Sequence, residues 1–498
     1  MSHGGIVNPS TPDAERSPAA PAQARGRGTA LIWILLAGAF VMVLNETVMG
    51  VALPPLMAEF EITASAGQWL TTVYMLVMAV LIPMSGFLLE RFTPRAIFVT
   101  ALSVFAVGTA AAALAPTLAV LVAARVAQAA GTAVIMPLLT TTILTRIPEG
   151  RRGRMMGLIA IVMSAAPALG PTVSGLLITA LGWRSVFLVV LPIAILVLIV
   201  GTLLIGPGTR GRDVKFDVLS ALLSVVAFGG LIYGLGSIGE AAAADAVISP
   251  LVPILVGVAG LGLFIWRQLV LQRRGNAFLD LRPFRERPFW VGVALIVVAM
   301  LSMFGSLILL PIYMQNVLGL SPLTTGLAVL PGGLVICVTA PVIGILFDRV
   351  GARPLVIPGA FIVAGGLVIL TQLGLTTPVW AIVVAMIVLY LGLALLMTPL
   401  MTGSLSSLEP HLYSHGSAIF STVQQLAGAA GTAVFVTIMS IGTAAGARAG
   451  LGEVAATAQG IHGAFVLAAI SSVIVIVLAF LVPKGRPVAP APAATAAE

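Results

Sequence analysis

Long apolar stretches alternate with short polar segments along the chain from residue 30 to residue 482. A helix that crosses a lipid bilayer needs about 20 mostly apolar residues, and fourteen of the stretches approach or exceed that length. They lie at 30–52, 68–89, 96–115, 118–141, 155–179, 185–206, 216–236, 250–270, 289–313, 324–347, 355–373, 378–400, 415–441 and 461–482. The pattern predicts an all-α integral membrane protein with 14 transmembrane helices.

Positive charges divide the polar segments into two kinds. Of the 25 lysines and arginines, only Arg184 and Arg448 fall in the loops of one side, and only Arg125 lies deep within an apolar stretch. The tails and the loops of the other side hold the rest, and such an excess marks the cytoplasmic face. We therefore expect a multi-pass protein of the bacterial cytoplasmic (inner) membrane with both termini in the cytoplasm. The same placement explains the net charge of +8 without nucleic acid as a partner.

Composition excludes a soluble enzyme or a soluble binding module. Among 498 residues, 59% are hydrophobic and 8% are charged, against about 25% charged residues in soluble proteins. The single cysteine, Cys337, allows no intramolecular disulfide, and the four histidines (His3, His411, His415 and His462) show no metal spacing and receive no role. No phosphate-binding loop and no nucleophile–base–acid set occurs, so we expect neither enzymatic activity nor a bound cofactor.

An internal repeat organises the chain. Residues 86–95 (GFLLERFTPR) and 344–353 (GILFDRVGAR) read alike, and each follows an apolar stretch. The number of residues between the two segments is larger than six helices with their loops occupy. The excess length fits two additional spans between two six-helix halves, and the halves form a parallel repeat. The expected divisions are a disordered tail at 1–29, a first half at 30–206, an additional pair at 207–275, a second half at 276–482 and a disordered tail at 483–498.

Four motifs in order carry a resemblance to a known family. They are LNETVMGVALP at 44–54, GFLLERFTPR at 86–95, RVAQAAG at 125–131 and GPTVSG at 170–175. With them, the chain resembles the fourteen-helix drug:proton antiporters of the major facilitator superfamily over nearly its whole length. The resemblance implies two six-helix halves with two extra central helices. It also implies a monomeric exporter of amphipathic or cationic drugs, antibiotics or toxic metabolites, driven by the proton motive force.

Glu46 and Arg125 are the candidate proton-coupling residues. They are the only acid and the only cation deep inside a predicted span, where an ionisable group is costly and indicates function. The first-helix motif usually has its acid where Asn45 stands, and a shift of one residue turns the carboxyl by about 100° around the helix. A static Glu46–Arg125 pair and recognition of a cationic substrate by Glu46 remain alternatives.

Polar and aromatic residues on other spans are candidates for substrate binding. Gln128 follows Arg125 on one helix face, and Gln424 and Gln425 belong to a polar stripe in the thirteenth stretch. With Asn45, these residues are expected to line a loosely selective cavity. Trp69 and Tyr313 are candidates for stacking on an aromatic or cationic ligand. Helix packing for the glutamines and an interfacial aromatic belt for the two rings are the alternatives.

Conformational roles follow from the repeated loops and from the fifth-helix motif. The resemblance implies that the loop residues steady one state of the alternating cycle, although simple positive-inside topology also explains the arginines. They are Gly86, Glu90, Arg91, Arg95, Asp348, Arg349 and Arg353. The resemblance gives Gly170, Pro171 and Gly175 a role in antiport, against the alternative of a packing kink. That motif favours export over a solute:proton symporter, and a lipid or envelope-component translocase is a further alternative.

Overall fold

The computed structural model describes residues 22–47, 49–62, 64–206, 216–242, 249–274 and 277–483, and every regular element in these ranges is helical. The first part of the chain forms α1 (Ala22–Thr47), α2 (Met49–Phe60), α3 (Ala64–Arg91), α4 (Pro94–Ala113), α5 (Leu118–Arg146), α6 (Glu149–Leu181) and α7 (Arg184–Leu204). The middle forms α8 (Val218–Ser224), the π-helical turn η1 (Val225–Gly229), α9 (Gly230–Ala242) and α10 (Leu251–Gln272). The last part forms η2 (Arg282–Arg285), α11 (Arg287–Ile312), η3 (Tyr313–Val317), α12 (Pro322–Val350), α13 (Arg353–Leu370), α14 (Val379–Ser406), η4 (Pro410–Leu412), α15 (Tyr413–Arg448) and α16 (Glu453–Leu481).

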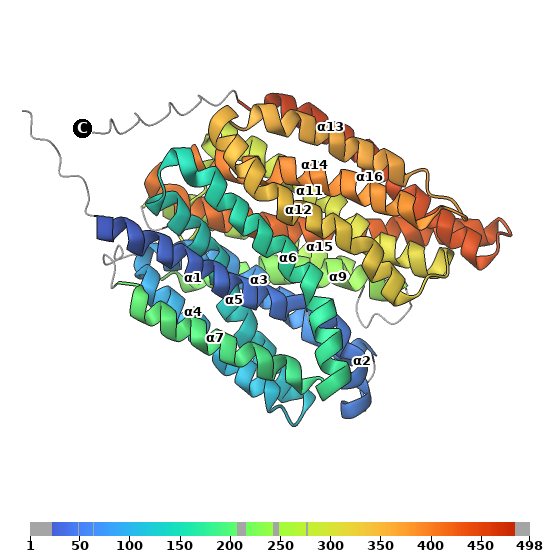
Figure 1. Ribbon diagram of the computed structural model, residues 1–498, viewed down its shortest axis with the longest axis horizontal. Coiled ribbons are helices and arrows are strands. Elements are labelled where there is room, and N and C mark those ends of the chain that lie inside the picture. The colour runs from blue at the N-terminus through green and yellow to red at the C-terminus, as the bar shows by residue number, and fades with distance from the viewer. Residues whose placement is uncertain are drawn as a thin grey trace, which may run out of the picture.

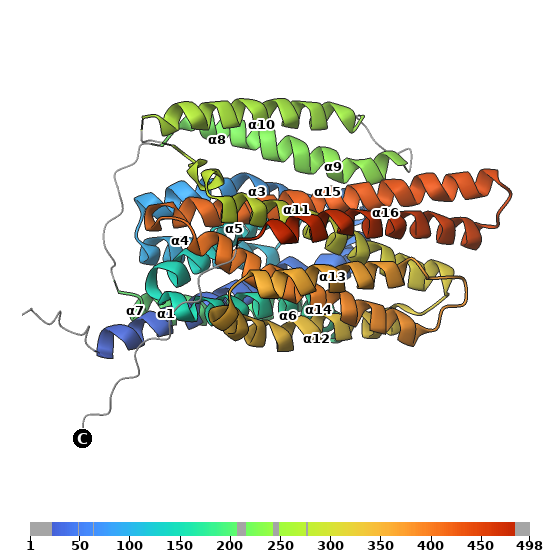
Figure 2. The same cartoon turned by 90° about the horizontal axis from the view of Figure 1, so that it is seen from above.

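Most helices run along the long axis of the molecule, with α1–α7 on one side and α11–α16 on the other (Figure 1). Figure 2 shows α8, α9 and α10 along one outer edge, with α10 outermost. We call the end at which α3, α5 and α12 end the arginine-rich end, because Arg91, Arg146 and Arg349 lie in their last turns.

Twelve helical segments of the described residues are long and apolar enough to cross a membrane. Leu31–Thr47 in α1 is a shorter apolar helix, and α6, which is 33 residues long, is not among the twelve. The expected count of fourteen is therefore not confirmed. The first predicted stretch, 30–52, falls on α1 and the start of α2, between which one residue, 48, lies outside the described residues.

The two repeated loops reverse the chain by different means. The Thr93 hydroxyl accepts a hydrogen bond from the Ala96 N–H at 3.2 Å, and Pro94 occupies the first turn of α4, where a proline is tolerated. In the second repeat, Gly351 follows α12 with φ of +80°, a conformation that glycine adopts without strain. A side-chain cap in one repeat and a glycine in the other thus serve the same turn, and the helix that follows has a proline in its first turn in both repeats.

Helix α6 packs closely against α12 at the arginine-rich end. A Cβ atom added to Gly153 would overlap the carbonyl oxygen of Gly344, and one added to Gly157 would lie 2.6 Å from the carbonyl oxygen of Ala340. Glycine at these positions lets the two backbones touch, as small residues do at membrane helix interfaces. This contact joins the first part of the chain to the last.

The additional helices are joined to each other by an ion pair. Asp217 accepts a hydrogen bond from the Ser220 N–H at 2.9 Å and caps α8. Its other oxygen lies 2.9 Å from Nη2 of Arg267 on α10. The hydrogen bond from Arg267, followed by those from Ser220, lowers the pKa of Asp217 to about 2.

Asp217→Asn is expected to lower the free energy of unfolding by about 1 kcal/mol, because the pair is mostly shielded from water. The carboxyl pKa is depressed on folding, so its contribution is complete above about pH 4 and is lost as the pH falls through 2. Thermal unfolding in detergent should therefore show a difference between the two proteins that is constant from pH 8 to pH 5. Glu61→Gln, at an exposed acid, is the control. A difference that grows between pH 8 and pH 5 would contradict this assignment.

Candidate functional site

A buried arginine lies in the third turn of α5. Arg125 is fully buried, and its Nη1 donates hydrogen bonds to Oε1 of Gln128 at 3.0 Å and to the Asn45 carbonyl oxygen at 3.4 Å. Its Nε donates to the Leu70 carbonyl oxygen at 3.4 Å, and the guanidinium carbon lies 4.1 Å from the centre of the Tyr74 ring. Carbonyl oxygens, an amide and a π face hold this guanidinium, so α1, α3 and α5 meet at one side chain.

The same face of α5 continues as a hydrogen-bonded chain. Gln128 is fully buried, and its Nε2 donates to Oγ1 of Thr109 on α4 at 3.0 Å. The Tyr74 hydroxyl donates to Oγ1 of Thr132 at 2.8 Å, and Thr132 donates in turn to the Gln128 carbonyl oxygen at 2.9 Å. In this conformation Gln128 is therefore a partner of Arg125, and its amide group faces α4.

Where Arg125 meets α1, several buried polar atoms have no hydrogen-bond partner among the described residues. Within the described residues, Nδ2 and Oδ1 of Asn45 and Nη2 of Arg125 are buried and make no hydrogen bond. The neighbouring Glu46 is partly exposed, and no ion pair joins it to Arg125 among the described side chains, although their charges are close enough to interact. A buried polar group without a hydrogen bond costs folding free energy, so these atoms indicate a functional role for this position.

The fifth-helix motif reaches the same turn of α1. A Cβ atom added to Gly170 would overlap Oγ1 of Thr47, which donates a hydrogen bond to the Leu44 carbonyl oxygen at 2.9 Å. Only glycine permits this approach, so α6 rests on the turn of α1 that carries Glu46. The side chain of Pro171 lies outside the described residues, and the Gly175 carbonyl oxygen accepts a hydrogen bond from Thr179 at 2.8 Å.

The other substrate-binding candidates are spread over the molecule. Trp69 is exposed and stacks on Tyr233 of α9 at 6.0 Å between ring centres. Tyr313 is buried, and its hydroxyl donates to the Gly374 carbonyl oxygen in the loop after α13. Gln424 and Gln425 are half-buried on α15. The structure therefore brings Asn45 and Gln128 together at Arg125 and leaves these four side chains elsewhere.

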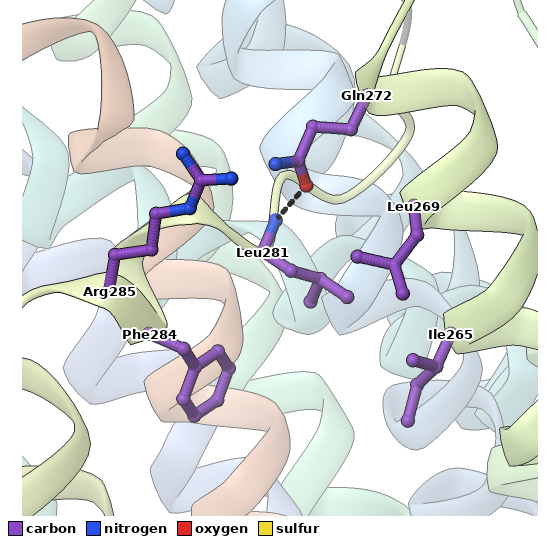
Figure 3. Close-up of a pocket in the computed structure, with 6 residues that line it drawn as sticks. All are labelled: Ile265, Leu269, Gln272, Leu281, Phe284 and Arg285. Atoms are coloured by element: carbon purple, nitrogen blue, oxygen red, sulfur yellow. Dashed lines mark hydrogen bonds between the residues drawn. The ribbon is translucent and has the colours of Figure 1, made fainter.

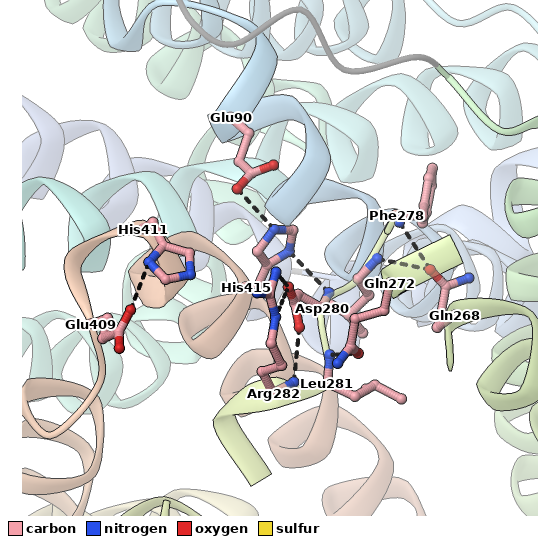
Figure 4. A network of polar contacts seen from close by, with 11 residues as sticks. Glu90, Gln268, Gln272, Phe278, Asp280, Leu281, Arg282, Glu409, His411 and His415 are labelled. Atoms are coloured by element: carbon pink, nitrogen blue, oxygen red, sulfur yellow. Dashed lines mark hydrogen bonds and ion pairs between the residues drawn. The ribbon is translucent and has the colours of Figure 1, made fainter. Parts of the chain in front are cut away.

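A buried histidine joins three parts of the chain at the arginine-rich end (Figure 4). His415, in the first turn of α15, lies 3.1 Å through Nε2 from Oε1 of Glu90 at the end of α3. Its Nδ1 accepts a hydrogen bond from the Asp280 N–H at 3.3 Å, so Nε2 carries the proton that faces Glu90. A Cβ atom on Gly86 would lie 2.8 Å from Nδ1 of His415, which shows how closely α3 approaches. We call Gly86, Glu90, Asp280 and His415 the His415 latch.

The segment before η2 connects this latch to the additional helices. Oε1 of the buried Gln268 on α10 accepts hydrogen bonds from the N–H groups of Phe278 and Leu279, at 2.9 and 3.0 Å. Asp280 follows directly and is held by Arg282, whose Nε donates to Oδ2 at 2.8 Å. Burial opposes ionisation of Asp280, but the hydrogen bonds from the Arg282 side chain and backbone outweigh it and lower the pKa of this carboxyl.

A second contact between the halves lies at the start of α6. The Asp348 carboxylate, from the end of α12, accepts hydrogen bonds from the N–H groups of Gly153 at 2.8 Å and Arg154 at 3.0 Å. These are backbone donors in the first turns of α6, where a helix favours a negative charge. Nearby, Nη1 of Arg152 donates to the Tyr413 hydroxyl at 3.3 Å.

The four arginines expected to steady the loops take different positions. Arg91 lies about 6 Å from the ring centres of Phe87 and Phe92. Arg95 donates to the Thr202 carbonyl oxygen at 2.9 Å and so fastens α4 to the end of α7. Arg349 is exposed, and Arg353 is half-buried at the start of α13. In the repeated loops, the acids Glu90 and Asp348 make polar contacts between the halves.

Direct polar contacts between the two halves gather at one end. Among the described residues they pair Glu90 with His415, Thr141 and the Pro137 carbonyl with Ser417, Arg152 with Tyr413, and Gly153 and Arg154 with Asp348. All of these lie toward the arginine-rich end. Arg125 and its partners Asn45, Tyr74 and Gln128, which we call the Arg125 cluster, lie away from that end, near the start of α5. The structure is therefore closed at the arginine-rich end.

Comparison with known proteins identifies this architecture. The family model of the Major Facilitator Superfamily matches residues 35–432. The chain belongs to the Major Facilitator Superfamily. The structure of the human organic anion transporter MFSD10 matches with a TM-score of 0.60 at 13% identity, over 92% of this chain and all of that chain. This likeness concerns the fold alone.

The relatives of this Major Facilitator Superfamily protein include bacterial proteins named for drug resistance. It is 40% identical to the uncharacterised MFS-type transporter YcnB of Bacillus subtilis, over 91% of this chain and 95% of that protein. It is 39% identical to the lincomycin resistance protein LmrB of Listeria monocytogenes, over 79% of this chain and 83% of the relative. It is 30% identical to the multidrug resistance protein Stp of Mycobacterium tuberculosis, over 77% and 71%. The resemblance to drug-transporting members of the superfamily is confirmed, and the chain is a multi-pass membrane transporter.

Proposed function

We propose that this transporter exports amphipathic or cationic small molecules, including antibiotics, in exchange for protons. Relatives with 30–39% identity carry the names lincomycin resistance protein and multidrug resistance protein. The observation that carries the proton-driven part is the Arg125 cluster, in which neutral groups bind the guanidinium and Glu46 stands beside it without an ion pair among the described residues. A carboxyl placed in this way can exchange its proton without breaking a salt bridge.

Glu46 is the proton carrier in this proposal, and Arg125 is its electrostatic partner. A nearby positive charge favours the ionised carboxylate, whereas a low-dielectric surrounding favours the protonated acid. Opening and closing of the cavity changes this balance, so the carboxyl takes up a proton from one side and releases it to the other. Asn45 borders this acid and has two unsatisfied polar atoms, which makes it the first candidate for contact with the substrate.

Fourteen spans and cytoplasmic termini complete the proposal. The α1–α2 pair and α6 add two spans to the twelve described apolar ones, and the arginine-rich end faces the cytoplasm of the inner membrane. In that orientation the described conformation is closed to the cytoplasm. One chain holds both halves and acts as a monomer, without nucleotide, metal or other cofactor.

The energy of one proton is sufficient for useful export. A charge that crosses a membrane potential of roughly 150 mV releases about 3.5 kcal/mol. At about 1.4 kcal/mol for each factor of ten, this supports a substrate gradient of about 300-fold. One proton for each neutral substrate therefore drives efflux without a second energy source.

Everted membrane vesicles test the proposal directly. Vesicles with this transporter are expected to move ethidium in a respiration-dependent manner, and added dye should partly collapse an imposed pH gradient. A protonophore should stop the transport, because no other drive is proposed. Vesicles with an empty vector are the control. Transport that persists with the protonophore would contradict proton coupling, and dye movement with the proton in the same direction would indicate a symporter.

A further inference from the structure

A groove lies on the outer surface between the end of α10 and η2 (Figure 3). It has a volume of about 400 Å³, within the usual range of small-molecule sites. The lining side chains are Ile265, Leu269, Gln272, Leu281, Phe284 and Arg285. Four are apolar, and Ile265, Leu269 and Phe284 are exposed. The groove is thus an apolar channel with polar groups from Gln272 and Arg285.

Positive charge is in excess around this groove. In the segment from α10 to the start of α11, Arg267 pairs with Asp217, and Arg282 pairs with Asp280. Exposed arginines at 273, 274, 285 and 287 remain, against the single exposed acid Glu286. In Figure 3, Arg285 and Gln272 stand on opposite walls of the groove above its apolar side chains. The site therefore offers an apolar floor and a cationic rim.

The position of the groove matches the surface of a membrane. Helix α10 is at the outer edge of the molecule (Figure 2), and its groove side chains Ile265 and Leu269 are exposed. Exposed tryptophans stand nearby, Trp266 on α10 and Trp290 on α11, as is usual for residues at the height of lipid headgroups. An exposed groove of this kind would meet an acyl chain and a headgroup together.

We propose that this groove binds one anionic phospholipid of the cytoplasmic leaflet. An acyl chain lies along Ile265, Leu269 and Phe284, and the headgroup phosphate meets the Arg285 guanidinium. Basic sites between membrane helices on the cytoplasmic side select anionic headgroups. Oε1 of Gln272 accepts the Leu281 N–H at 3.2 Å, so the amide NH₂ of Gln272 can donate to the same phosphate. A free anion would gain no binding free energy from the apolar side chains of the groove, and a zwitterionic lipid would gain little from its arginines.

The bound lipid also touches the wall that leads to the His415 latch. Leu281, which Gln272 holds, directly follows Asp280, whose N–H donates to His415. Lipid in the groove therefore steadies the backbone that supplies one hydrogen bond of the latch. The proposal depends on the orientation of the chain in the membrane and is independent of which compounds it exports.

Native mass spectrometry of the full-length transporter, with phosphatidylglycerol or phosphatidylcholine of equal chain length, tests this site. The wild type is expected to retain one phosphatidylglycerol at concentrations at which phosphatidylcholine is lost. Arg285→Gln should weaken retention about fivefold, the effect of about 1 kcal/mol for one arginine near a lipid surface. Arg146→Gln, which removes an exposed arginine from α5 at the same end, is the matched control and should leave retention unchanged.

Leu269→Trp provides a second test, because it fills the groove and leaves every charge in place. It should also weaken phosphatidylglycerol retention, and glycerol phosphate without acyl chains should fail to compete. The proposal would be overturned if the wild type retained the two lipids equally, or if glycerol phosphate competed effectively. It would also be overturned if Arg285→Gln and Arg146→Gln reduced phosphatidylglycerol retention by the same factor. Because the readout is binding, a failure of drug export would leave this result unaffected.

Discussion

Glu46→Gln is expected to abolish proton-driven efflux while leaving downhill substrate movement intact. Glutamine has nearly the shape of glutamic acid but cannot release a proton, so the gradient no longer performs work. The loss should exceed 100-fold in the gradient of a neutral substrate that everted vesicles maintain, since one proton supports about 300-fold for an uncharged substrate. Two measurements in the same vesicles distinguish proton coupling from substrate passage. They are uptake of dye against its gradient and dye exchange without a gradient.

Glu453→Gln is the matched control for this experiment, because Glu453 is an exposed acid in the first turn of α16. It should keep full uphill transport at equal expression. Normal uphill transport by Glu46→Gln would show that Glu46 is not the proton carrier. Loss of both uphill and downhill movement would favour a structural role, such as positioning of α1 against Arg125.

Gly153→Ala is expected to reduce transport by roughly tenfold or more by forcing the arginine-rich end open. The new Cβ would overlap the Gly344 carbonyl oxygen and lie 2.6 Å from Oδ1 of Asp348. A backbone atom cannot move aside alone, so α6 and α12 must separate. Overpacking of this kind costs about 1–3 kcal/mol, which shifts the balance of closed and open states roughly 5- to 150-fold.

Distances between spin labels at positions 146 and 409, in a Cys337→Ser background, measure this opening. Both positions are exposed and lie at the arginine-rich end in different halves of the chain. Gly365→Ala on α13 is the control, because a Cβ atom there meets open space. If Gly153→Ala gave the same distances and transport as Gly365→Ala, close packing of α6 on α12 would not govern closure.

Much of the fold follows from the sequence because a bilayer imposes a strong length requirement on apolar helices. The positions of the repeated loops could also be predicted, since acids and arginines after an apolar stretch mark the end of the helix. Asp217 shows the limit of that information. An acid at the edge of an apolar stretch predicts a helix end, but the pairing of Asp217 with Arg267 depends on how α8 and α10 lie side by side.

The site could be predicted only in part, for a similar reason. Arg125 and Glu46 stood out because charge inside an apolar stretch is rare and costly. His415 received no role from the sequence, since histidine spacing suggested no metal. Its partners come from α3 and from the segment before η2, and Asp280 is 135 positions away. Such a latch is visible only after the helices are packed. Its one local signal was a histidine at the start of an apolar stretch.

The hydrogen bonds of Gln268 have a consequence for protein engineering. A twelve-helix transporter cannot be made from this chain by simply excising α8–α10 and joining the two halves. The deletion would leave the N–H groups of Phe278 and Leu279 without their acceptor. It would also loosen the residue that donates to His415. The α8–α10 segment therefore supports the contact between the two halves. A shortened protein would need another hydrogen-bond acceptor in place of Gln268.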